Sequence, residues 1–331
     1  MQNIVSAYTL AYSILTAFTF MAFLVYIFRK KELLNLLPII ATLVTVFLLY
    51  RILGLSGTAG YYDMLALDLC IALLSTILAI FYISKPYIFI GMIILLVAGF
   101  MIFEINYYGN TTFAGMFAIG TIFGLLYREF ALAPKRSEKA KKMKKVEINR
   151  DLIQIFLGAI LVAIIVIFPY LASVSVIFGL ILLAYTSNNL LANLRIGPIY
   201  RRAMDLERKD VTYGQGATYL AASTAMVMGF THGSMVLLFG VAVLFFADSL
   251  ATIVGVSSRG AATLPYNRNK TFIGTAAFFL IAAVAGYFTI GLWYGLLFAL
   301  VLAFVESLGS SIDDNIRSGV VVIILTLLLG L

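Results

Sequence analysis

Long apolar runs follow one another along almost the whole chain, and short charged or polar segments separate them. A helix needs about 20 apolar residues to cross the hydrocarbon core of a bilayer. Only 11% of the residues are charged, against roughly 25% in soluble globular proteins. The sequence therefore predicts an all-α, polytopic integral membrane protein with about 12 transmembrane helices. The runs lie at about residues 4–28, 35–53, 64–83, 86–105, 112–127, 152–171, 174–193, 214–231, 233–254, 272–289, 291–307 and 319–331.

A strongly basic segment divides these runs into a first group of five and a second group of seven. We expect an N-terminal bundle over residues 1–134, a basic cytoplasmic linker over 135–151 and a C-terminal bundle over 152–331. The basic residues from the linker are Lys135, Arg136, Lys139, Lys141, Lys142, Lys144, Lys145 and Arg150.

The positions of the basic residues also predict the orientation of the chain. If the N-terminus lies outside, every second loop faces the cytoplasm, and these loops hold every Lys and Arg except Arg51. Cytoplasmic loops of membrane proteins carry such an excess of Lys and Arg. The net charge of +8 therefore reflects topology, and we expect no nucleic acid partner. We expect a multi-pass protein of the cell membrane, or of the endoplasmic reticulum membrane if the source is eukaryotic.

Two residue types are too scarce to support several kinds of site. Cys70 is the single cysteine and His232 the single histidine. This scarcity excludes a disulfide framework, a zinc site built on cysteines, and a metal cluster built on histidines.

The carboxylates of the second group are candidates for catalysis and metal binding. Asp248 lies inside an apolar run, where a carboxylate is costly without a partner or a wet cavity. Glu306 ends a later run, and Asp313, Asp314 and Asn315 follow it on the same predicted face of the membrane. Oxygen ligands of this kind suit Mg²⁺, which binds one or two carboxylates together with substrate phosphates. We therefore assign Asp248 and Glu306 to catalysis, and Asp248, Asp313, Asp314 and Asn315 to Mg²⁺.

Cations, hydroxyl groups and glycines on the same predicted face are candidates for binding phosphate, because helix N-termini and basic side chains bind anions. Topology alone also supplies basic residues in cytoplasmic loops, and the segment around Arg208 equally suits a surface that contacts anionic lipid. The candidate nucleotide-binding residues are Arg259, Gly260, Arg268, Lys270, Thr271, Gly274, Thr275, Arg208, Gly214 and Gly216.

Three motifs in this half resemble the dolichol kinase and phytol kinase family of CTP-dependent polyprenol kinases. They are Asp248-Ser-Leu-Ala-Thr-Ile-Val-Gly255, then Lys270-Thr-Phe-Ile-Gly-Thr-Ala-Ala277, then Glu306 followed by Asp313-Asp-Asn315. The resemblance covers about residues 145–320. Ile273 stands where the family pattern has Glu, and the family's His before its first span is absent here.

The resemblance implies a polyprenol kinase bundle over the second group of helices, whose site faces the cytoplasm. It implies transfer of the CTP γ-phosphate, with Mg²⁺, to the hydroxyl of a long-chain isoprenoid alcohol dissolved in the bilayer. In this hypothesis Lys270 and Arg268 hold the phosphates, and Glu306 or Asp248 orients the alcohol.

Two other functions stay open at this point. A CTP-using cytidylyltransferase that makes a CDP-lipid would use the same nucleotide, metal and membrane. A non-enzymatic membrane transporter would need ionisable residues near the midplane of several spans, whereas the charged residues here gather at one face.

Overall fold

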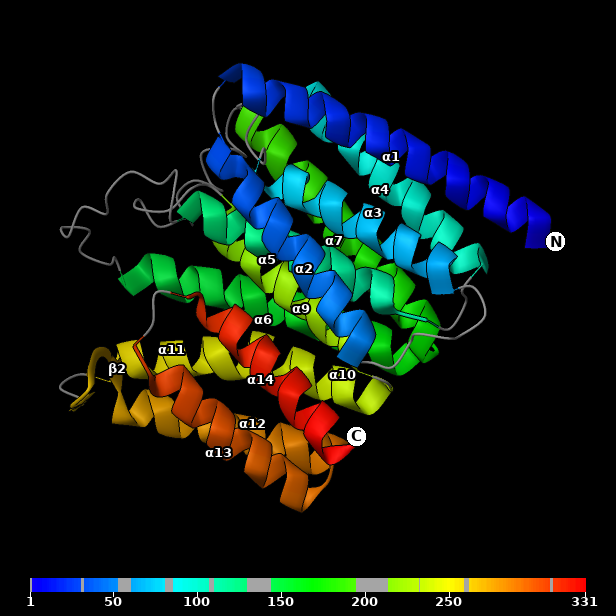
Figure 1. Cartoon of the computed structure of the whole chain (residues 1–331). Coiled ribbons are helices and arrows are strands. Elements are labelled where there is room, and N and C mark those ends of the chain that lie inside the picture. The colour runs from blue at the N-terminus through cyan, green and yellow to red at the C-terminus, as the bar shows by residue number, and fades with distance from the viewer. Residues whose placement is uncertain are drawn as a thin grey trace. The chain divides into compact units, whose positions relative to one another are not determined.

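The chain is an all-α polytopic membrane protein, as predicted. The computed structural model describes residues 2–30, 33–52, 61–80, 86–106, 110–129, 144–194, 214–231, 233–258, 262–309 and 312–331. These residues form 12 continuous helical segments and very little sheet (Figure 1). Seven of the helices are long and apolar enough to cross a membrane. Helices suit this environment because their backbone groups bond within the helix, where lipid offers no partner.

The first group of helices matches the predicted runs closely. A short 3-10 turn, η1, at Leu33–Asn35 precedes α2. The predicted run at 112–127 coincides with the observed helix, which is buried along most of its length. The bounds are α1 (Gln2–Lys30), α2 (Leu36–Ile52), α3 (Tyr61–Ile80), α4 (Pro86–Asn106) and α5 (Thr112–Tyr127).

The second group contains two features that hydrophobic runs do not reveal. The run at 233–254 is one continuous helical segment in which a π-helical stretch, η3 (Ala242–Ala247), separates α10 (Ser234–Val241) from α11 (Asp248–Ser257). The predicted loop 255–271 contains an antiparallel hairpin of β1 (Thr263–Leu264) and β2 (Asn267–Thr271). The other helices are α6 (Lys144–Ile167), α7 (Tyr170–Leu194), α9 (Gln215–Phe230), α12 (Phe272–Thr289), α13 (Leu292–Ser307) and α14 (Asp314–Leu329).

Contacts within the chain define two compact units. The first comprises residues 1–134 and 182–195, and the second comprises 135–181 and 196–331. The second half of α7 thus belongs to the first unit. The candidate site residues that the structure describes all belong to the second unit, so elements of that unit position them.

Candidate functional site

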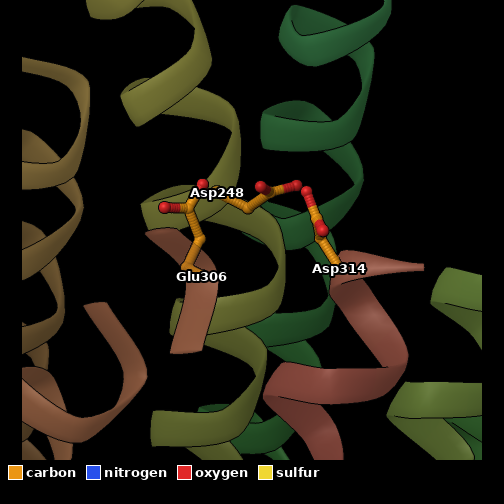
Figure 2. Close-up of side chains that lie close together, drawn as sticks. All are labelled: Asp248, Glu306 and Asp314. Atoms are coloured by element: carbon orange, nitrogen blue, oxygen red, sulfur yellow. The ribbon is translucent and has the colours of Figure 1, made fainter. Parts of the chain in front are cut away.

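Three carboxylates meet in the second unit. Asp248 begins α11, Glu306 lies one residue before the end of α13, and Asp314 begins α14. Each offers one oxygen, and these oxygens lie within 4.8 Å of one another. Figure 2 shows the three side chains pointing toward a common region from three separate segments. Asp248 therefore joins two residues that lie more than fifty positions later in the sequence, and the three form one acidic cluster, which we call the carboxylate trio.

Lys270 supplies positive charge to the trio from the end of β2. Its Nζ donates to Glu306 Oε1 and, at 2.9 Å, to Asp314 Oδ2. Burial lowers the pKa of Lys270, but the carboxylates of Glu306, Asp314 and Asp248 raise it more. The pKa therefore lies above its ordinary value, and the ammonium group is charged at neutral pH.

Arg317 gives Asp314 a second cationic partner one helical turn away. Its Nη2 donates to Asp314 Oδ1, and its Nη1 donates to the carbonyl oxygens of Val305 at 2.7 Å and Leu308 at 3.0 Å. Arg317 thus ties the start of α14 to the end of α13. Burial raises the pKa of Asp314, but Lys270 and Arg317 lower it more, so the net pKa lies below its ordinary value. Asp314 is therefore ionised at neutral pH, and each of its oxygens accepts from a cationic side chain.

Asp313 caps α14 and does not belong to the trio. Its Oδ1 accepts from the Asn315 backbone N–H at 3.0 Å and from Asn315 Nδ2 at 3.1 Å. Burial raises the pKa of Asp313 to about 6, although these bonds to Asn315 lower it. The cap fixes the first turn of α14 and thereby the position of Asp314.

Close packing of α11 on α12 holds Asp248 and Lys270 in their places. Thr271 caps α12 by accepting from the Gly274 N–H at 3.1 Å. A Cβ on Gly274 would meet Thr271 Oγ1 at 3.0 Å and the Ala251 carbonyl oxygen at 3.1 Å. Gly255 also contacts this point, since its own Cβ would meet Thr271 Oγ1 at 3.0 Å. The glycines of the first two motifs therefore allow helix contact, which explains their place beside the site.

The hairpin is fastened to the end of α13. Asn267 Nδ2 donates to the Ser307 carbonyl oxygen at 2.9 Å, and the Tyr266 hydroxyl lies 2.9 Å from Ser307 Oγ. These bonds fix β2 next to Glu306. Lys270 thus approaches Glu306 from a strand whose other end is anchored.

The π-helical stretch sets the direction of Asp248. The Asp248 N–H donates to Val243 O, one residue further back than in an α-helix. Leu244 O, which an α-helix would pair with that N–H, accepts instead from Gln154 Nε2 of α6 at 3.2 Å. Gln154 therefore satisfies the carbonyl group that the π-helical stretch releases. Such stretches often occur at functional sites.

The donor set of the trio fits Mg²⁺. All three side chains offer hard oxygen ligands. Two further oxygens, Glu306 Oε2 and Asn315 Oδ1, are buried without a hydrogen-bond partner among the described residues. A divalent cation would satisfy such oxygens. Lys270 already neutralises part of the negative charge, which leaves a cluster that one Mg²⁺ and the phosphates of a ligand would complete.

The remaining predicted residues differ in how they relate to the trio. Arg268 is exposed on β2, two residues from Lys270. Thr275 Oγ1 is buried without a partner among the described residues. Gly214 and Gly216 lie at the start of α9, and Gly214 has a positive φ of 74°. Arg208, Arg259 and Gly260 lie outside the described residues.

Some residues of the site escaped the sequence analysis. The i, i+3 spacing of Asp314 and Arg317 on a helix is a signal for an ion pair that could have identified Arg317. Gln154 and Asn267 gave no such signal, because each acts on a backbone group distant in the sequence. Ile273, which replaces the family's Glu, is 48% exposed on the first turn of α12.

Comparison with known proteins found one similar chain of limited extent. An uncharacterized protein of Methanocaldococcus jannaschii is 34% identical over 121 residues, which are 36% of this chain and 61% of that protein. This chain therefore spans less than two thirds of its relative's length. No protein family model matches the sequence, and no solved structure matches it. The relative's name assigns no activity, so function must be argued from the site.

Proposed function

We propose that this protein is a CTP-dependent, Mg²⁺-dependent kinase that phosphorylates the hydroxyl group of a long-chain isoprenoid alcohol at the cytoplasmic face of the membrane. The observation that carries the proposal is the carboxylate trio of Asp248, Glu306 and Asp314, together with Lys270, which donates to two of these carboxylates. Phosphoryl transfer needs a positioned metal, cations on the phosphates and a carboxylate near the nucleophile. The resemblance of the three motifs to polyprenol kinases adds the nucleotide and the class of alcohol.

Each residue of the trio has a role in this proposal. Asp248 and Asp314 hold Mg²⁺, which when bound neutralises charge on the phosphate oxygens. Lys270, with Arg268 nearby on β2, contacts the phosphates. Glu306 accepts the hydroxyl proton as the alcohol oxygen bonds to the γ-phosphorus and the bond from that phosphorus to CDP breaks. The isoprenoid chain stays among apolar helices, so that only its hydroxyl group reaches the trio.

The test is a phosphorylation assay on the purified full-length protein with CTP labelled at the γ-phosphate, a polyprenol and Mg²⁺. We expect labelled lipid phosphate and free CDP, and we expect both to be lost in Asp248→Asn and Asp314→Asn. Asp63→Asn, which changes a carboxylate of α3 in the first unit, is the matched control and should keep full activity. A parallel assay with a polyprenyl phosphate in place of the polyprenol tests the alternative. Release of pyrophosphate with a CDP-lipid in that assay would replace the proposal with a cytidylyltransferase, and absence of a lipid product from either substrate would reject both.

Magnesium binding gives a separate readout. A ligand that binds only the folded state stabilises it, and the stabilisation grows with the logarithm of the ratio of ligand concentration to Kd when that ratio is large. We expect Mg²⁺ to raise the melting temperature of the wild type more than that of Asp248→Asn or Asp314→Asn. An equal rise in melting temperature in all three proteins would show that Asp248 and Asp314 do not bind the metal.

A further inference from the structure

One carboxylate is fully buried in the first unit. Asp68 of α3 has no exposed surface. It is seven residues beyond the first residue of α3, roughly 10 Å along the helix. Ionisable residues inside membrane helices are costly, and they commonly mark ion or proton sites. The kinase proposal gives Asp68 no role.

The hydrogen bonds of Asp68 are unequally shared between its two oxygens. Tyr50 of α2 donates to Oδ2 at 2.5 Å, and Thr112 of α5 donates to the same oxygen at 3.0 Å. Oδ1 is buried and accepts no hydrogen bond from the described residues. Among those residues, no basic side chain forms a salt bridge with Asp68. The described residues thus supply no cation for a negative charge on this carboxylate, and one of its buried oxygens has no hydrogen-bond partner among them.

Further hydroxyl groups lie in the interior of the first unit, where α3 packs against α2 and α5. Thr76, eight residues further along α3, lies 3.0 Å from Thr42 of α2 through their hydroxyl oxygens. Gly120 brings α5 so close to α3 that a Cβ would lie 2.1 Å from Ser75 Oγ. Thr121 Oγ1 is buried without a partner among the described residues. Thr76 is roughly 12 Å along α3 from Asp68, so the interior of the first unit holds polar groups besides Asp68 and its two partners.

The other titratable groups near α3 do not compensate Asp68. The helices α1, α2, α4 and α5 all pack against α3. The titratable side chains that are buried or half-buried on these helices and on α3 are Tyr12, Tyr50, Asp63, Cys70, Glu104 and Tyr127. Of these, Tyr50 is the one that the described hydrogen bonds join to Asp68. None carries a positive charge, so a cation must come from outside the set.

We propose that Asp68 is the principal ligand of an intramembrane site for a monovalent cation, H⁺ or Na⁺, in the first unit. One monovalent cation neutralises the single carboxylate, whereas a divalent ion would leave net charge in an apolar environment. Tyr50 and Thr112 orient the carboxylate by bonding Oδ2 and leave Oδ1 for the cation. The proposal is independent of the kinase activity.

The test uses dicyclohexylcarbodiimide, a hydrophobic reagent that modifies protonated carboxyl groups inside membranes, on the full-length protein in lipid nanodiscs. Peptide mass spectrometry measures modification of Asp68 at several pH values, in NaCl and in choline chloride. We expect modification that decreases as the pH rises. Slower modification in NaCl than in choline chloride identifies Na⁺ as a ligand, and dependence on pH alone identifies H⁺.

A second measurement does not depend on access of the reagent. We expect the melting temperature of the wild type to change with pH or Na⁺. The variant Asp68→Asn should lose this response, and the control variant Asp63→Asn should keep it. Thr112→Val removes one donor to the carboxylate, so modification should persist to higher pH.

The proposal is overturned if Asp68 reacts equally at every pH and salt, as a permanently protonated group would. It is also overturned if Asp68 is unreactive and the melting temperatures of wild type and Asp68→Asn respond alike.

Discussion

Lys270 neutralises part of the negative charge of the carboxylate trio, and its removal should affect stability as well as activity. The Glu306 side chain is 4% exposed and that of Lys270 is 23% exposed. Removing one partner of a buried ion pair leaves an uncompensated charge and typically costs roughly 3–5 kcal/mol. Because Lys270 is partly exposed, we expect Lys270→Met to lower the free energy of unfolding by about 2 kcal/mol. Denaturant unfolding in detergent, without Mg²⁺, measures the change.

The double variant Lys270→Met/Glu306→Gln provides the control for this prediction. It removes the buried negative charge together with its partner, so part of the lost stability should return. Activity should stay low, because both groups belong to the proposed catalytic set. If Lys270→Met is as stable as the wild type, the ion pair contributes nothing to folding.

The sequence indicates which acidic residues are candidates for the site, but it does not indicate which of them joins the trio and which caps a helix. Asp248 and Glu306 stood out because apolar runs rarely contain or end in carboxylates. Asp313 and Asp314 are adjacent in the sequence and chemically identical, and we assigned both to Mg²⁺. In the structure Asp313 caps α14, whereas Asp314 belongs to the trio. Only the start point of α14 distinguishes them, and hydrophobic patterns locate helix ends poorly.

At the level of elements, α12 and α13 form a hairpin whose backbones touch. A Cβ on Gly295 would lie 2.6 Å from the Gly286 carbonyl carbon and 2.8 Å from the Tyr287 nitrogen. These atoms belong to a helix backbone and cannot rotate away. Gly295→Ala should therefore push the two helices apart, lower the free energy of unfolding by about 1–3 kcal/mol and reduce activity by moving Glu306.

Gly179→Ala in α7 is the matched control for Gly295→Ala. Nothing lies within 4 Å of the Cβ that it adds, and alanine favours a helix over glycine by about 0.5–1 kcal/mol. The control should be neutral or stabilising. Equal destabilisation by both substitutions would indicate a general effect of removing glycine, and it would contradict the packing argument.

Gln154 should act on catalysis through the π-helical stretch. Gln154→Leu removes the donor to Leu244 O, a hydrogen bond worth about 1 kcal/mol. We expect the turnover number to fall while the KM for CTP changes little, because Asp248 moves and Lys270 does not. Ile153→Ala, at an exposed neighbouring position of α6, should leave turnover unchanged. A change in stability without a change in turnover would make Gln154 a packing residue only.

The helices were predictable, whereas the π-helical stretch and the hairpin were not. Apolar runs of sufficient length indicate spanning helices directly, as α12 shows, whose bounds coincide with the predicted run 272–289. A π-helical stretch leaves the hydrophobicity of the run unchanged and shifts only which residues share a face. The hairpin at 263–271 has only two residues in β1, and Asn267 and Tyr266 fix it through Ser307. Such tertiary bonds leave no periodic pattern in the sequence.

At the scale of the whole molecule, the orientation in the membrane decides whether the trio can meet CTP. The hairpin between α11 and α12 carries Arg268 and Lys270 and lies at the trio end of the second unit. Trp293, at the start of α13, lies at the opposite end of the α12–α13 hairpin. The positive-inside rule predicts that the trio end faces the cytoplasm. One cysteine at each end can therefore report the orientation.

Tyr266 and Trp293 are suitable positions because their side chains are 58% and 80% exposed, whereas the native Cys70 is 7% exposed. We expect a membrane-impermeant maleimide to label Trp293→Cys in intact cells, and to label Tyr266→Cys only after permeabilisation, both in a Cys70→Ser background. The Cys70→Ser protein alone is the control and should stay unlabelled. Labelling of Tyr266→Cys from outside would put the trio on the face away from cytoplasmic CTP. Because the kinase and the cytidylyltransferase both require that nucleotide, this outcome would reject both and leave a transport function as the alternative to pursue.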